Sequence, residues 1–192
     1  MYDTVVADLN WFLEHVRIAS GILAYQAADW NPLQDYHIQI RCDACPKGMG
    51  FWCVNSLEGF YADVPVWFNK PEIFYWEAVC ILSALLWAAK QRKIKANQGQ
   101  RLRVLLLTDN EPTVHIFDSL GALPFYNEIL KEAVHVLITE SIDLRVLHIP
   151  GEQNEIADVL SRKRFDIARQ LQPGLVIKPF QPPRLSLGAA EK

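Results

Sequence analysis

The stretch "RVLLLTDN", residues 103–110, joins an unbroken apolar run to a polar end. A continuous run of this kind, without alternating polar positions, is typical of a central strand that is covered on both faces. It therefore indicates an α/β fold, in which helices lie on both sides of a sheet. Asp109 follows the run directly, so its carboxylate is expected at the carboxyl end of this strand.

The segments on either side of this stretch complete the predicted sheet. Before it lie three strand-like pieces separated by turn residues, which suggests an antiparallel meander: "YHIQIRCDA" at 36–44, "GFWCVN" at 50–55 and "GFYADVPVWF" at 59–68. A fifth strand, "IDLRVLHIP", is expected at 142–150. Helices are expected from Pro71 to Lys90 and at 111–120, 125–141 and 152–165. The order βββαβααβα predicts a mixed five-stranded sheet with helices on both faces.

The two ends of the chain are expected to lie outside this domain, which we place at residues 35–165. Residues 1–34 comprise an amphipathic helix and a connecting segment, with Asp3 or Thr4 as the cap and Gly21 as the stop. Because the helix carries an apolar stripe, it must dock on another surface; the stripe is Val5, Leu9, Phe12, Val16 and Ala19. Residues 166–192 contain several prolines and are expected to be a tail or linker.

Composition limits the choice of environment and partner. The 192 residues have a net charge of −3, which does not by itself favour nucleic-acid binding. The stretch from Lys90 to Arg103 nevertheless holds six basic residues and no acid, and is either a solvated loop or a phosphate-contacting patch. The apolar run Ala78–Ala89 falls short of the roughly 20 residues that span a bilayer, so no membrane is expected. No secretory signal is recognisable, so an intracellular location is expected, whether nucleus or cytoplasm.

The chain has four cysteines: Cys42, Cys45, Cys53 and Cys80. Cys42 and Cys45 form a C-x-x-C pair, but a zinc site would require a second closely spaced pair, which Cys53 and Cys80 do not supply. Structural thiols are therefore favoured over a metal or redox role.

Four carboxylates occupy comparable places: Asp43 in the first strand, Glu77 in the first long helix, Asp109 at the end of the fourth strand and Asp158 in the last helix. Glu77 is the single acid of the apolar segment 74–90, where an unpaired buried charge would cost several kcal/mol. Converging acids repel one another unless cations lie between them, and Mg²⁺ prefers carboxylate oxygens. Two such ions, about 3.5–4 Å apart, can activate water and stabilise the leaving oxygen of a phosphodiester.

Four strings carry a resemblance to a known family: "CDACPKGMGFW", "WEAVCILSALLWA", "LLLTDN" and "HIPGEQNEIADVLSR". They resemble the ribonuclease H domain of retroelement reverse transcriptases. That domain shows D-[AG]-[ST]-x-x-G-x-G, a helical Glu, T-D-N or T-D, and P-G-x-x-N-x-x-A-D-x-L-S-R. The resemblance covers residues 36–164, and its last motif is the most specific. The N-terminal "DLNWFLEHVRIASG" is similar to the segment that connects polymerase and ribonuclease H in DIRS-like elements with tyrosine recombinases, and a Ty3-type element is the other option.

This resemblance implies a metal-dependent endonuclease that hydrolyses the RNA strand of RNA–DNA hybrids. It implies a ribonuclease H-like fold. It also implies that two Mg²⁺ ions, with Mn²⁺ as a substitute, are held by Asp43, Glu77, Asp109 and Asp158. The implied partners are the hybrid and the polymerase domain of the same polyprotein. His148 stands at a spacing where cellular members have a histidine that assists proton transfer or product release; otherwise it is a strand-end histidine without a catalytic role.

Other interpretations of the same residues remain open. The domain could be catalytically silent and only bind nucleic acid or a partner protein. Asp109 could be the N-cap of the following helix, Asp158 a surface acid paired with Arg162, and Asp43 a turn-initiating acid before Pro46. Two related enzyme classes are disfavoured: a 3′–5′ exonuclease of this fold would carry D-x-E in its first strand, whereas Asp43 is followed by Ala44 and Cys45, and a transposase or integrase would order its acids D, D, E, which this chain does not.

Overall fold

A six-stranded mixed sheet organises the chain in the computed structural model, which describes residues 3–19, 30–65, 73–94, 101–121 and 123–185. The strands are β1 (Ile38–Cys45), β2 (Gly48–Cys53), β3 (Glu58–Asp63), β4 (Leu102–Thr108), β5 (Ile142–His148) and β6 (Val176–Pro179), in the order β5-β4-β1-β2-β3-β6. The helices are α1 (Asp3–Ile18), α3 (Ile73–Ile94), α4 (Glu111–Ser119), α5 (Asn127–Thr139), α6 (Glu155–Ser161) and α7 (Phe165–Leu171), with short 3₁₀ turns η1 (Pro124–Tyr126) and η2 (Gly151–Gln153).

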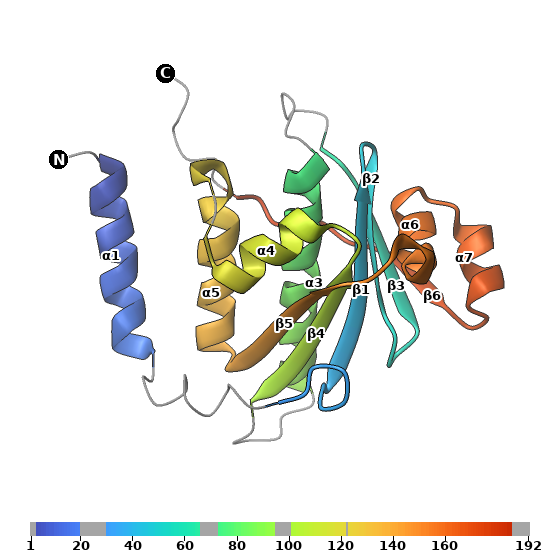
Figure 1. Cartoon of the computed structure of the whole chain (residues 1–192), viewed down its shortest axis with the longest axis horizontal. Helices are drawn as coiled ribbons and strands as arrows, with labels where there is room; N and C mark the ends of the chain where they lie inside the picture. The colour runs from blue at the N-terminus through green and yellow to red at the C-terminus, as the bar shows by residue number, and fades with distance from the viewer. Residues whose placement is uncertain (1–2, 20–29, 66–72, 95–100, 122, 186–192) are drawn as a thin grey trace.

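Helices cover both faces of the sheet, as the sequence predicts. Figure 1 shows α3, α4, α5 and α1 on one side and α6 with α7 on the other. The meander of β1, β2 and β3 is antiparallel, whereas β1, β4 and β5 are parallel. Strand β4 contributes Val104, Leu105 and Leu106, all fully buried, because layers lie on both of its faces.

The predicted count of five strands is wrong, and so is the prediction that the chain from residue 166 is only a tail or linker. Residues 165–171 form α7, and Val176–Pro179 pairs in parallel with β3 as a sixth strand. The sequence did not predict this strand because it is a four-residue, mostly exposed edge strand that ends in proline. The predicted helix at 152–165 is also interrupted, since Lys163 adopts a positive φ of 58° between α6 and α7.

Helix α3 is the core helix of the domain. Among the described residues it alone is long and apolar enough to cross a membrane by length and composition, but 72% of the window Ile73–Gln91 is buried inside the protein. Its buried side chains pack on β1 and β2 and against α5, as expected for a core helix with a sheet on one side. Pro71, expected in its first turn, lies outside the described residues.

Helix α1 docks on α5 through its polar side. Asp8 pairs with Lys131 at 2.5 Å, and His15 Nε2 lies 2.9 Å from His135 Nδ1. The apolar stripe that was expected to dock is exposed instead, and polar side chains next to it make these contacts with α5; the exposed members include Val5, Leu9, Phe12 and Val16.

The basic stretch and the cysteines have structural roles where the structure describes them. Arg101 pairs with the buried carboxylate of Asp143 at 2.6 Å, and the Arg103 guanidinium lies over the Trp30 ring. Residues 95–100 and the side chains of residues 92–94 lie outside the description. All four cysteines are free and buried, as structural thiols are.

Candidate active site

The parallel pairing of β1 with β4 brings Asp43 and Asp109 to the same edge of the sheet. Arg41 is the register partner of Leu107, and each acid lies two residues beyond these positions. Adjacent strands are about 4.8 Å apart, so the two acids emerge side by side where the parallel strands end. Open α/β sheets build their sites at this edge. Asp43 itself pairs with Gly50 in the antiparallel ladder, so it is a strand residue and does not initiate a turn.

Asp43 and Glu77 are buried carboxylates with unused hydrogen-bonding capacity. Their exposed fractions are 6% and 5%, and Asp43 Oδ2 and Glu77 Oε2 are buried without a hydrogen-bond partner among the residues that the structure describes. Burying an unpaired carboxylate oxygen is costly, so such atoms require an explanation in the function of the protein.

The pKa values of these two acids reflect both burial and mutual repulsion. Burial raises the pKa of Glu77 to about 8; the charge of Asp43 adds to the rise, a backbone hydrogen bond from Ala44 opposes it, and the charge of Asp109 adds further. Burial raises the pKa of Asp43 to about 7. A hydrogen bond with Ser161 opposes this rise, and the charges of Asp109 and Asp158 add to it. The four acids therefore form one electrostatic group with Asp43 in the middle.

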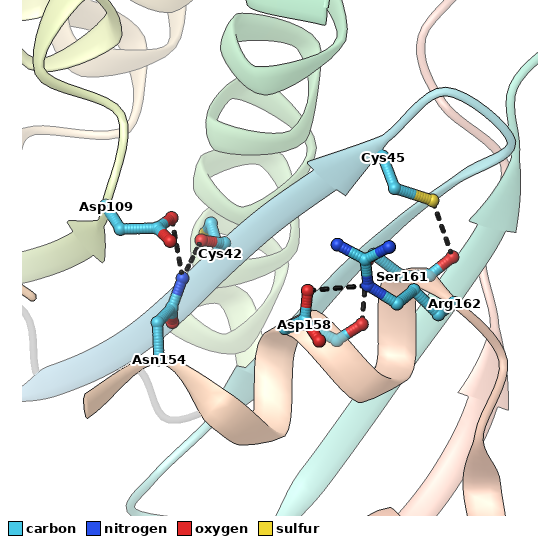
Figure 2. A network of polar contacts seen from close by, with 7 residues as sticks. All are labelled: Cys42, Cys45, Asp109, Asn154, Asp158, Ser161 and Arg162. Carbon is cyan, nitrogen blue, oxygen red and sulfur yellow. Dashed lines mark hydrogen bonds and ion pairs between the residues drawn. The ribbon is translucent and has the colours of Figure 1, made fainter. Parts of the chain in front are cut away.

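Asp109 is exposed and is not the cap of the next helix. That role falls to Asn110, whose side chain accepts a hydrogen bond from the Thr113 amide at 2.9 Å. The capping interpretation of Asp109 is therefore wrong, because α4 begins at Glu111, one residue later than a cap at Asp109 would require. Figure 2 shows the Asp109 carboxylate turned toward Asn154, which donates to its Oδ1 at 3.2 Å.

Asn154 is a site residue whose role the sequence did not reveal. It is 1% exposed and its amide group donates to the Cys42 carbonyl at 2.8 Å as well as to Asp109. It thus joins the middle of β1 to the acid after β4. The only signal was its place in the motif at 148–162, which carries no information on what its side chain contacts.

Asp158 reaches the site because α6 lies unusually close to β2. A Cβ at Gly48 or Gly50 would overlap the backbone of Ser161, so only glycine permits this approach. Asp158 accepts from Arg162 Nε at 2.7 Å (Figure 2), and its side chain is 38% exposed. The predicted surface pair with Arg162 is thus present, and the charge of Asp158 still acts on Asp43.

His148 ends β5 at the same edge of the sheet. Its register partner is Thr108, the residue before Asp109, and its side chain is exposed. The position allows access to the group of acids, and a catalytic role for His148 stays a prediction.

The donor set suits a divalent cation in part. Two unpaired, buried carboxylate oxygens beside a third acid are hard ligands of the kind that Mg²⁺ prefers. Across the part of the chain that the structure describes, no three His, Cys, Asp or Glu side chains are arranged as a complete ligand set. Asp109 and Asp158 are engaged by Asn154 and Arg162, so holding a cation requires these two side chains to turn inward.

Asn154→Asp is expected to destabilise the protein by about 2 kcal/mol, because the buried Cys42 carbonyl loses its donor and a second carboxylate then faces Asp109. For a chain of this size that corresponds to a fall in Tm of about 4–8 °C, measurable by thermal denaturation.

The neighbouring change Gln153→Glu is the control for this prediction. Gln153 is exposed, so adding a charge there should change stability by less than about 0.5 kcal/mol. If Asn154→Asp has the same Tm as Gln153→Glu, the hydrogen bonds of Asn154 to Cys42 and Asp109 do not stabilise the protein.

Comparison with known proteins supports the fold. No protein-family model matches the chain, and no curated protein matches its sequence. Among solved structures, LC11 ribonuclease H1 in complex with an RNA/DNA hybrid aligns with a TM-score of 0.53 and 19% identity, covering 68% of this chain and 98% of that one. Ribonuclease H1 from the halophilic archaeon Halobacterium salinarum NRC-1 aligns with a TM-score of 0.52 and 17% identity, with the same coverage. The chain therefore has a ribonuclease H-like fold, and the predicted fold class is confirmed.

Proposed function

We propose that the protein is a metal-dependent endonuclease that hydrolyses the RNA strand of RNA–DNA hybrids. The observation that carries this proposal is the pair of buried, unpaired carboxylate oxygens on Asp43 and Glu77, placed beside Asp109 where two parallel strands end. The fold is shared with ribonucleases H, one of which is described in complex with such a hybrid.

In this proposal, Asp43, Glu77, Asp109 and Asp158 hold two Mg²⁺ ions, for which Mn²⁺ can substitute. The ions would supply an activated water and stabilise the leaving oxygen. The chain's own residues set the geometry: Asn154 orients Asp109, and Arg162 holds Asp158 until a cation competes for it. His148 is the proposed proton carrier.

We further propose that this domain works inside the cell beside a polymerase domain, in the polyprotein of a DIRS-like or Ty3-type retroelement. The support is the resemblance of the motifs between residues 36 and 164 to those of retroelement reverse transcriptases. The exposed apolar side of α1 is available for such a neighbour.

A catalytically silent binding domain is the second candidate. The observation that favours it is the Asp158–Arg162 pair, which satisfies one of the four acids without a metal.

One experiment separates the two candidates. Purified protein is incubated with end-labelled RNA–DNA hybrid, single-stranded RNA and duplex DNA, in Mg²⁺ and in EDTA. The nuclease is expected to cut only the RNA of the hybrid and only with Mg²⁺, which should also raise the Tm because a ligand of the native state stabilises it. Intact hybrid together with an unchanged Tm would favour the silent domain.

A further inference from the structure

A cleft beside the candidate active site carries a strong local charge. It has a volume of about 490 Å³, and its walls are the β1–β2 turn, residues 45–47, and the segment that ends α6, residues 161–164; Asp63 also lines it. Four cationic side chains line it against this one carboxylate: Lys47, Arg162, Lys163 and Arg164. This concentration contrasts with the net charge of −3 of the whole chain.

The two walls are held to each other by a side-chain hydrogen bond and by a close backbone approach. Cys45 Sγ donates to the Ser161 carbonyl at 3.4 Å, and Gly48 lets the end of α6 approach the turn. The α6 segment then ends in a tight turn, in which Lys163 has a φ of 58° and the Arg164 amide donates to the Val159 carbonyl at 2.7 Å. The positions from which the cationic side chains project are thus set by the fold.

Two of the four cations are already neutralised and two are not. Arg162 pairs with Asp158, and Lys163 pairs with Asp63. Lys47 and Arg164 are exposed, and neither has an ion pair with any residue that the structure describes. A cleft with two unneutralised cations on fixed backbone attracts a polyanion.

The cleft continues directly from the candidate catalytic acids. Cys45 lies two strand residues beyond Asp43, and Arg162 lies one helical turn beyond Asp158. Rises of about 3.3 Å per strand residue and about 1.5 Å per helical residue place the cleft roughly 6–7 Å from these acids. A nucleic-acid strand carries a phosphate about every 3.4 Å along the axis, so the separation corresponds to one or two nucleotides.

We infer that this cleft binds a backbone phosphate of a nucleic-acid strand, one or two nucleotides from the scissile position, with Lys47 and Arg164 as its contacts. The inference rests on the proposed nuclease function for the meaning of "scissile". It assigns the main phosphate-binding surface to residues 47 and 164, in place of the basic stretch from Lys90 to Arg103. Contacts of this kind position the backbone and carry no base specificity.

The test measures binding of RNA–DNA hybrid to the full chain by fluorescence anisotropy at several salt concentrations, in an Asp109→Asn background that leaves the substrate uncut. Lys47→Ala/Arg164→Ala should weaken binding about tenfold or more. It should also flatten the plot of log affinity against log salt by just under one unit for each lost phosphate contact. Lys47→Gln/Arg164→Gln, which keeps more of the side-chain bulk, should lose the same amount.

The matched control is Arg17→Ala/Lys90→Ala, which removes the same charge from the exposed ends of α1 and α3. Lys90 lies roughly 20 Å along α3 from Glu77 by helical rise, so the control should bind nearly as the parent does. Equal losses in both pairs, or no loss at the cleft, would overturn the inference, as would a parent that binds no hybrid. Hybrid binding that depends on the cleft without any cleavage by the unmodified protein would refute the nuclease proposal alone.

Discussion

Asp109→Asn is expected to remove Mg²⁺-dependent cleavage of RNA–DNA hybrid, with a fall in turnover of about a hundredfold or more. Even residues that only support metal ligands contribute about 10–100-fold, and Asp109 is proposed as a ligand itself. The substitution keeps the size of the side chain and an oxygen that can accept from Asn154, but removes the charge that a cation requires. Turnover of labelled hybrid under saturating Mg²⁺ measures the effect.

Folding should be unaffected by this change, because the cap of α4 is Asn110 and not Asp109. The Tm of Asp109→Asn should therefore stay within about 2 °C of the unmodified protein. Asp118→Asn is the matched control, since it makes the same chemical change at an exposed position of α4 and should leave activity intact. Cleavage by Asp109→Asn at the rate of its control would remove Asp109 from the active site.

The metal-free protein is expected to lose stability as the pH rises from about 4 to about 8. Burial raises the pKa of Glu77 to about 8 and that of Asp43 to about 7 in the folded state. An unfolded Glu titrates near 4.3, so the folded protein binds more protons than the unfolded chain across this window. Stability is complete below the unfolded pKa and declines until the folded pKa is passed. For Glu77 alone the loss is about 4 kcal/mol, or a fall in Tm of about 10 °C.

Glu77→Gln should remove most of this pH dependence, because an amide at the same position does not titrate. The metal-free variant should match the unmodified protein near pH 4 and melt about 10 °C higher near pH 8. Mg²⁺ should raise the Tm of the unmodified protein at pH 8, since a cation compensates the charge of the two acids. It should raise the Tm of the variant by less. Thermal denaturation from pH 4 to pH 8, with EDTA or Mg²⁺, measures all four curves.

The control for the pH series is Glu14→Gln, an exposed acid on α1, which should follow the unmodified protein at every pH. If the stability of the metal-free protein instead rises toward pH 8, burial does not raise the pKa of Glu77. The same conclusion follows if the Glu77→Gln variant keeps the full slope.

Local sequence was sufficient to predict most elements and the fold class. The apolar run 103–108 and the helix at 74–90 are strongly patterned, and both are buried as their composition requires. Acids placed after or within such elements could be assigned to one edge of the sheet, because parallel strands end together. Asp43 lies within the first strand and Asp109 directly after the fourth, as expected from the sequence, and the parallel pairing of β1 with β4 is what the structure adds.

Where two local solutions were equally good, sequence could not choose between them. Asp109 and Asn110 are both good capping residues, and the choice depends on the residue at which β4 turns away from its neighbours. Strand β6 has only four residues and is mostly exposed, so its strand conformation comes from pairing with the edge of β3. The break at Lys163 likewise depends on the packing of α6 on β2 and of α7 beside it.

The sequence by itself determined which residues are acidic, apolar or small, and hence the layers of the fold and the edge where the acids gather. Only the tertiary structure decided that Asn154 bridges Cys42 and Asp109, and that Lys47 and Arg164 line one cleft. These partners are far apart along the chain, and their meeting depends on how closely α6 approaches β2 at Gly48 and Gly50. A pattern of residue types records local preference, whereas such contacts arise from the packing distance between elements.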